Sequence, residues 1–285
     1  MSHFILTVSA QDRIGIVAAV TSWLAANDGF IIESQQYADL ESGRFFMRLA
    51  FQGAGPAFPP QSELKSDFKS IAERYDLEWD LASTDERLRV MIAVSKGGHC
   101  LNDLLHRWRI GSLPIDIPLI ISNHADLAPL AGFHGIPFHH LPIINGDKAG
   151  QESRLLQLVE DHRIDLVVLA RYMQVLSDQA CRALSGRCIN IHHSFLPSFK
   201  GARPYHQAHA RGVKLIGATA HYVTGDLDEG PIIEQMAERV DHGHTADAMA
   251  AMGRDLEAQV LARAVTWAAQ RRVLPNGQRT IVFRP

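Results

Sequence analysis

The chain has 285 residues, of which 46% are hydrophobic and 21% charged, and its formal net charge is −3. This length allows a sizeable core in one or two domains, while the near-neutral charge gives no basic footprint for nucleic acid. Three cysteines without C-x-x-C spacing, no basic leader and no apolar run of ~18 residues favour a cytoplasmic protein with reduced thiols and neither nucleic-acid nor membrane partners.

Residues 1–82 predict a small α+β domain. We expect strands over 3–9, 30–37, 43–52 and 77–81 and helices over 14–27 and 61–75. In 43–52 the apolar side chains of Phe45, Met47, Leu49 and Phe51 alternate with polar ones such as Arg48, which is typical of a half-buried strand. The order strand, helix, strand, strand, helix, strand is the split βαβ, ferredoxin-like arrangement.

Residues 83–87 (S-T-D-E-R) are short and polar and predict a linker, and residues 88–285 predict a second domain. There, strands alternate with helices, and 164–169 is almost entirely apolar, as expected for a strand covered by helices on both faces. The second domain should therefore be a doubly wound, mostly parallel α/β sheet. Its first strand ends in S-K-G-G-H, without the G-x-G-x-x-G that a dinucleotide would require.

Two polar residues, Asn190 and His192, lie two apart in C-I-N-I-H-H-S-F-L-P-S, so an extended strand would point both to one face. Asp228 follows in a Gly-rich turn, D-L-D-E-G-P-I-I. A carboxamide, an imidazole and a carboxylate can polarise a carbonyl, carry a proton and orient a water. Taken singly, each residue is more often an ordinary turn former, core residue or surface group than a catalytic one.

Together, the two motifs strongly resemble the formyltransferase family that handles 10-formyltetrahydrofolate. The resemblance implies that Asn190, His192 and Asp228 are catalytic, with folate as substrate, no further cofactor and no metal. It also implies a folate-binding set, partly in the segment A-R-Y-M-Q-V-L-S, comprising Arg171, Tyr172, Met173, Gln174, Val175, Leu176, Thr219, His221, Asp226 and Leu227. The alternative for the A-R-Y-M-Q-V-L-S segment is the core face of the next helix.

The segment S-K-G-G-H-C-L-N-D-L-L resembles the deformylase branch of that family more than the transferases. Lys96 and His99 are then candidates for the acceptor side, with ordinary helix capping as the alternative. The implied reaction is hydrolysis of 10-formyltetrahydrofolate to formate and tetrahydrofolate, which supplies formate for one-carbon and purine metabolism. Transfer to an amine such as glycinamide ribonucleotide, or a non-catalytic regulator binding folate or an amino acid, remain the alternatives.

The N-terminal domain resembles an ACT domain, with D-R-I-G-I-V at its first strand-to-helix turn. Backbone N–H groups at a helix start suit a carboxylate, so Asp12, Arg13, Ile14 and Gly15 are candidates for binding an amino-acid effector. A plain helix entry is the alternative. The resemblance also implies a homo-oligomer, either a dimer or a tetramer.

Overall fold

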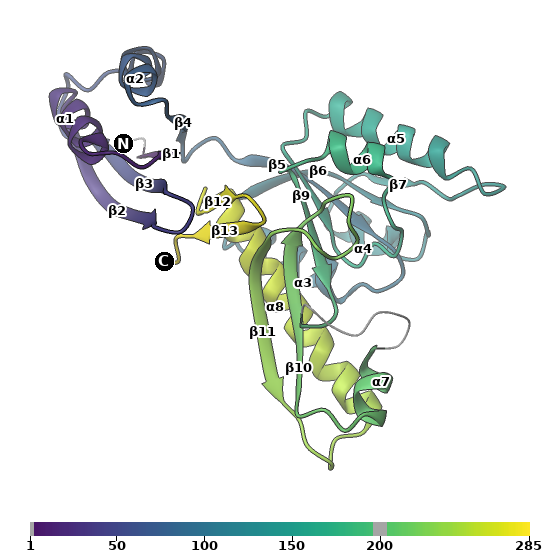
Figure 1. Ribbon diagram of the computed structural model, residues 1–285. Coiled ribbons are helices and arrows are strands. Elements are labelled where there is room, and N and C mark those ends of the chain that lie inside the picture. The colour runs from purple at the N-terminus through teal and green to yellow at the C-terminus, as the bar shows by residue number, and fades with distance from the viewer. Residues whose placement is uncertain (1–2, 196–203) are drawn as a thin grey trace. The chain divides into compact units, whose positions relative to one another are not determined.

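The structure is a computed structural model and describes residues 3–195 and 204–285; for Pro204 only the backbone is described. The chain forms two compact units, drawn in Figure 1. The first contains the residues up to Arg87 together with Gln270–Leu274 and Ile281–Pro285, and the second contains Leu88–Ala269 and Pro275–Thr280. The sequence had predicted all of 88–285 in the second domain.

The first unit is a four-stranded sheet with two helices. Its elements are β1 (His3–Gln11), α1 (Ile16–Ala26), β2 (Gly29–Asp39), β3 (Arg44–Gly53), α2 (Gln61–Tyr75) and β4 (Glu78–Ser83). The order β2-β3-β1-β4 is antiparallel throughout. The apolar alternation in β3 places Met47, Leu49 and Phe51 in a core with Trp23 of α1 and Phe68 of α2. The expected β-α-β-β-α-β order is present.

The other face of β3 is also covered, which the sequence did not indicate. Phe46 packs against Leu274, Ile281 and Phe283 of the C-terminal segment, which includes β12 (Val273–Asn276) and β13 (Arg279–Val282). Arg48, expected on the polar face, is consequently 3% exposed. The carboxylate of Glu33 accepts from Arg48 Nη1 at 2.6 Å and from Arg272 Nη2 at 2.9 Å, so this buried charge is paired.

The second unit is built on a seven-stranded mixed sheet in the order β11-β10-β9-β8-β5-β6-β7. Its elements are β5 (Leu88–Val94), α3 (His99–Arg109), β6 (Ile115–Ser122), α4 (Ala128–Phe133), β7 (Phe138–His140), α5 (Lys148–Asp161), β8 (Leu166–Leu169), α6 (Asp178–Ala183), β9 (Cys188–His192), α7 (Pro204–Ala210), β10 (Leu215–Tyr222), β11 (Ile232–Arg239) and α8 (Ala246–Ala269). β7, β6, β5, β8 and β9 are parallel, and β10 and β11 are antiparallel.

Helices cover both faces of this sheet (Figure 1). Leu155 and Leu158 of α5 and Leu184 near α6 share a core with Met91 and Val167 of the sheet, while α8 packs against β9 and β10 and also against α3. β8 is buried at every residue, as its apolar composition predicts. This layering places the carboxyl ends of β8 and β9 side by side, where ligands of such sheets bind.

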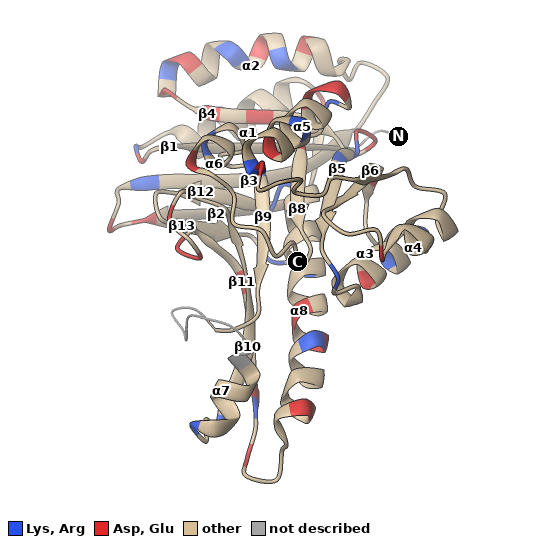
Figure 2. Ribbon diagram, turned by 90° about the vertical axis from the view of Figure 1, so that its right-hand side faces the viewer, with Lys and Arg blue, Asp and Glu red and all other residues tan. Residues whose placement is uncertain are grey.

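Acidic and basic residues alternate along the visible faces of α2 and α8 (Figure 2). Such mixing of signs along a helix is typical of a solvated surface. The three cysteines are free and buried. In the described part of the chain, no helix combines the length and apolarity needed to cross a bilayer.

Candidate active site

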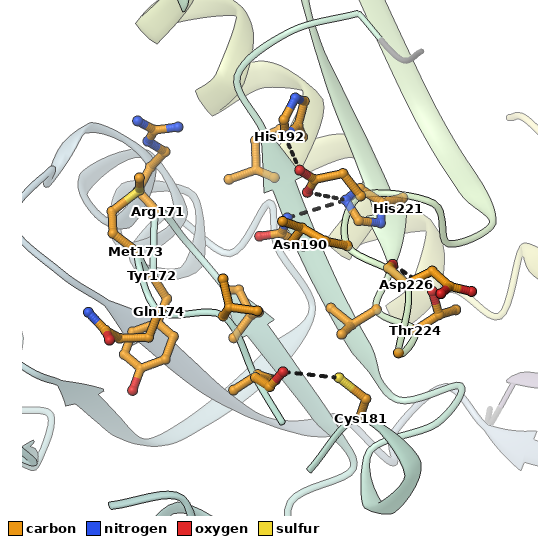
Figure 3. Close-up of a pocket in the computed structure, with 18 of the residues that line it drawn as sticks. Arg171, Tyr172, Met173, Gln174, Cys181, Asn190, His192, His221, Thr224 and Asp226 are labelled. Carbon is orange, nitrogen blue, oxygen red and sulfur yellow. Dashed lines mark hydrogen bonds and ion pairs between the residues drawn. The ribbon is translucent and has the colours of Figure 1, made fainter. Parts of the chain in front are cut away.

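Two antiparallel strands and one loop bring four polar side chains together. β10 runs beside β9 with His221 opposite Asn190, and the loop after β10 carries Asp228. The carboxylate of Asp228 places Oδ2 3.1 Å from His192 Nδ1 and Oδ1 3.7 Å from His221 Nε2 (Figure 3). Asn190 Nδ2 lies 3.2 Å from the same His221 nitrogen. The three residues singled out by their motifs therefore lie together, with His221 as a fourth member.

Hydrogen-bond partners fix the protons on the two rings. His221 Nδ1 lies 2.8 Å from the carbonyl oxygen of Tyr222, which can only accept, so Nδ1 carries the proton of the neutral ring and Nε2 accepts from Asn190. For the same reason His192 Nδ1 donates to the Asp228 carboxylate. His192 Nε2 is buried without a hydrogen-bond partner among the residues described. That nitrogen and the second N–H of Asn190 are left for a ligand.

These side chains form one end of a pocket of about 280 Å³. Leu169, Leu176, Cys181 and Val223 also line it and belong to one hydrophobic cluster, of which Cys181 lies toward the opposite end (Figure 3). Figure 3 shows His192 and Arg171 toward one end of the pocket and Cys181 toward the other. A cleft that is apolar along most of its wall and polar at one end suits a flat ring system carrying a reactive polar group.

Two buried anchors hold the pocket wall formed by residues 170–177. Ser95, at the end of β5, donates its N–H to the Arg171 carbonyl at 3.2 Å, and its Oγ accepts from the Met173 N–H at 2.9 Å. At the other end, the Ser177 N–H donates to Glu152 Oε1 at 2.9 Å. The wall is therefore fixed by the sheet and by α5, which is the rigidity that a binding surface needs.

Comparison with known proteins places the chain in a family. The formyl transferase family pattern matches residues 88–265. A formyltetrahydrofolate deformylase of Corynebacterium sp. (strain P-1) is 48% identical over 98% of both chains, and one of Bacillus subtilis (strain 168) is 49% identical over 98% of this chain and 93% of that protein.

Solved structures separate the two branches of the family. A formyltetrahydrofolate deformylase from Burkholderia mallei ATCC 23344 matches with a TM-score of 0.95 and 51% identity over the whole of both chains. Glycinamide ribonucleotide transformylase 1 from Symbiobacterium toebii matches with a TM-score of 0.65 and 29% identity over 70% of this chain and 95% of that one. The chain belongs to the formyltetrahydrofolate deformylase family.

Most of the folate-binding residues that the sequence suggested for a deformylase line the pocket. These are Arg171, Tyr172, Met173, Gln174, Val175, Leu176, His221, Asp226 and Leu227. Thr219 is the exception, because its Oγ1 donates to the carbonyl of Ser194 at 3.0 Å and accepts from Gln235 Nε2 at 3.0 Å. Both Thr219 and His221 are buried in β10.

The two acceptor-side candidates behave differently from expectation, because neither lines the pocket. Lys96 is exposed, whereas His99 Nε2 is bonded to Glu257 Oε2 of α8 at 2.7 Å. In the first unit, Asp12, Arg13 and Ile14 are exposed at the start of α1, and Gly15 has a positive φ of 100°.

The site also contains residues that sequence reasoning missed. His193 lines the pocket beside the catalytic candidates, and burial, with the nearby charges of Arg171 and His192, lowers the pKa of His193 to about 4. Ser95 and Glu152, which anchor the pocket wall, were also missed. The position of Ser95 at the carboxyl end of a predicted parallel strand was a usable signal, whereas Glu152 had no signal beyond its place in a predicted helix.

The ionisation of Asp228 makes the stability of a deformylase of this kind depend on pH. Burial raises the pKa of its carboxyl, but the interactions with His192 and His221 outweigh burial and hold the pKa below the ordinary 3.8. The ion pairing therefore stabilises the fold fully above that value and is lost as the pH falls through the folded-state pKa. We expect the urea midpoint of the wild type, relative to Asp228→Asn, to be constant above about pH 5 and to fall as the pH is lowered from there through 3.8 and below. A pH-independent difference would contradict this assignment.

Gly230 allows the close turn that returns the Asp228 loop to the sheet. A Cβ at Gly230 would lie 1.7 Å from the Tyr222 carbonyl oxygen. We therefore expect Gly230→Ala to lower the free energy of unfolding by about 1–3 kcal/mol, measured by urea denaturation, and to slow catalysis through the displaced loop. Gly225→Ala is the matched control, because its Cβ would lie 3.6 Å from Asp178 Oδ1 and its φ is not positive. Equal losses in both variants would argue against this role.

Proposed function

We propose that the chain hydrolyses 10-formyltetrahydrofolate to formate and tetrahydrofolate, as its relatives are named to do. The observation that carries the proposal is the meeting of Asn190, His192 and Asp228 at the polar end of an otherwise apolar pocket. With the pterin ring at the apolar end, the formyl group on N10 would reach the polar end. Folate is the substrate, and the mechanism below uses no resident cofactor and no metal.

The first step is attack of water on the formyl carbon, which turns the carbonyl oxygen into an oxyanion. Donors must lie where that charge develops. The second N–H of Asn190 and the Nε2–H of protonated His192, neither of which has another described partner, would serve as these donors. Asp228, bonded to His192 Nδ1, stabilises the imidazolium form of that ring.

During the attack, Asp228 Oδ1, which lies 3.7 Å from His221 Nε2, retains lone pairs that can orient the water and accept its proton. The second step is collapse of the tetrahedral intermediate. N10 takes up one proton as the C–N10 bond breaks, and formate leaves. Water thus supplies the new oxygen, and the two protons it brings are divided between N10 and the surrounding groups.

We propose that Arg171, Tyr172, Met173, Gln174 and Val175, with their neighbours on the wall, contact the folate. Support comes from their place along the pocket and from the anchoring of the wall by Ser95. Asp226 and Leu227, in the loop of Asp228, would close over the substrate from the opposite side.

The first unit is proposed to be a regulatory ACT-like domain over residues 1–82, joined through 83–87 to the catalytic part. The β-α-β-β-α-β order supports this assignment. An amino-acid effector would bind at Asp12, Arg13, Ile14 and Gly15, where three exposed residues precede the start of α1. β2 is an edge strand whose Phe30 and Ile32 are exposed, which supports a homo-oligomer.

The experiment that tests the function is formate release from 10-formyltetrahydrofolate without any amine present. Release of one formate per tetrahydrofolate formed would support hydrolysis. Turnover only when glycinamide ribonucleotide is added would instead indicate a transferase, and tight folate binding without turnover would indicate a regulator. Repeating the assay with single amino acids tests the effector proposal, and the Asp12→Ala variant should lose any response.

A further inference from the structure

A buried carboxylate outside the pocket joins three separate elements of the second unit. Glu257 of α8 has a side chain that is 1% exposed. Its carboxylate lies 2.7 Å from His99 Nε2, accepts from the Tyr205 hydroxyl at 2.9 Å and forms an ion pair with Arg171 Nε at 3.3 Å. We call these four residues the Glu257 cluster.

The Glu257 cluster is a network of ion pairs and hydrogen bonds around one ionised carboxylate. Burial raises the pKa of Glu257, but the bond from His99 and the charge of Arg171 outweigh burial, so the net pKa is lowered and the carboxylate is ionised. Cys100 lies close enough to complete a metal-ligand set with His99 and Glu257. Burial and the charge of Glu257 raise the pKa of this thiol, and three donors already occupy the carboxylate. The geometry therefore favours the ion pair over a metal site.

The absence of a side chain at Gly253 lets Tyr205 approach α8 closely enough to reach Glu257. Gly253 lies one helical turn before Glu257 on α8, and a Cβ there would be 2.0 Å from Tyr205 Cζ. The ring can therefore pack directly on the helix backbone and present its hydroxyl to Glu257. With His99 at the start of α3 and Tyr205 on α7, the carboxylate is held from two directions and can in turn hold Arg171.

Arg171 connects the Glu257 cluster to the end of the pocket that contains His192. Its side chain lines the pocket together with His192, His193 and Asp228. Figure 3 shows Arg171 across the pocket from His192. Its backbone has a positive φ of 65°, a conformation that costs a non-glycine residue of order 1 kcal/mol or more, so an ordered arginine here needs compensating contacts. The bond to Glu257 is one such contact.

We propose that Arg171, held by Glu257, His99 and Tyr205, fills the space from which an amine acceptor would reach the formyl carbon, so that only water enters. This specificity role rests on the proposed function. An acceptor must approach to about 3–3.5 Å of the carbon it attacks. With folate at the apolar end, the acceptor would enter past Arg171 and His193, which both line the pocket. In transfer to an amine, nitrogen bonds to the formyl carbon, the C–N10 bond breaks, and the proton lost by the amine balances that gained by N10.

The test measures how the Arg171→Gly variant divides its product between formylated amine and formate. Glycine adopts a positive φ without strain and removes the whole side chain. The full-length protein is given 10-formyltetrahydrofolate with hydroxylamine or glycinamide, and formylated amine is measured against formate. We expect the formylated fraction to rise about tenfold or more over wild type. Arg163→Gly is the matched control, because Arg163 is exposed with a φ of 48° and lies outside the pocket, and it should partition as wild type does.

The ratio is independent of the total rate, so a slower variant still gives an answer. Glu257→Gln keeps the size of the side chain but releases Arg171, and its formylated fraction should rise in the same direction. Added guanidinium ion at non-denaturing concentration should lower the fraction in Arg171→Gly by refilling the space. An unchanged fraction in Arg171→Gly and Glu257→Gln, with formate still released, would overturn this inference alone. Absence of formate release by the wild type would overturn the proposed function and the inference with it.

Discussion

Asp228→Asn is expected to lower kcat for formate release by about 10³-fold while changing KM by less than about threefold. The amide has the shape of the carboxylate, but it can neither stabilise the imidazolium of His192 nor accept a proton from water. The backbone should be undisturbed, because Asp228 has a φ of 59° and asparagine is among the residues that tolerate this region best. Steady-state kinetics with 10-formyltetrahydrofolate gives both constants.

Asp241→Asn is a suitable control for this variant. Asp241 Oδ1 lies 2.8 Å from His244 Nδ1, so the chain offers a second Asp–His pair, and this one is exposed and outside the pocket. Its loss should leave kcat unchanged. If Asp228→Asn kept more than about a tenth of wild-type kcat, the carboxylate would not have the proposed role.

Local periodicity predicted the part of the site that lies on one strand. Asn190 and His192 share a face because side chains alternate along β9, and the position of residues 170–177 followed from the apolar strand before them. Asp228 is on a separate loop, and no local pattern connects it to β9. Only the resemblance of its motif to a known family linked the two, and the structure places the side chains 3.1 Å apart.

What the sequence could not predict depends on contacts between distant segments. Arg48 alternates with apolar residues as a solvent-facing side chain would, yet it is buried because C-terminal residues return to cover that face. His99 was expected near the acceptor, but Glu257, 158 residues later, holds it. Thr219 likewise donates its hydroxyl to the carbonyl of Ser194, a residue 25 positions earlier in the chain. A single strand or helix carries no information about which partner will cover it.

The largest effect after that of Asp228 is expected for His192→Ala, which should lower kcat by about 10²–10³-fold. The variant removes the buried Nε2 donor and the partner of the Asp228 carboxylate. If the two side chains act as one unit, the remaining residue contributes little once the other is lost. The double variant His192→Ala with Asp228→Asn should therefore be less than about tenfold slower than the slower single variant.

This comparison separates a joint role from two independent ones. Independent contributions would multiply, so the double variant would lose about 10⁵-fold or more. Single-turnover measurement of formate release avoids any contribution from product dissociation. Urea midpoints of the three variants provide the control for folding, because a buried pair that loses one member leaves the other unpaired. Multiplicative losses in folded variants would mean that Asp228 acts on water or substrate without needing the imidazole, and the 3.1 Å contact between them would then have only a structural role.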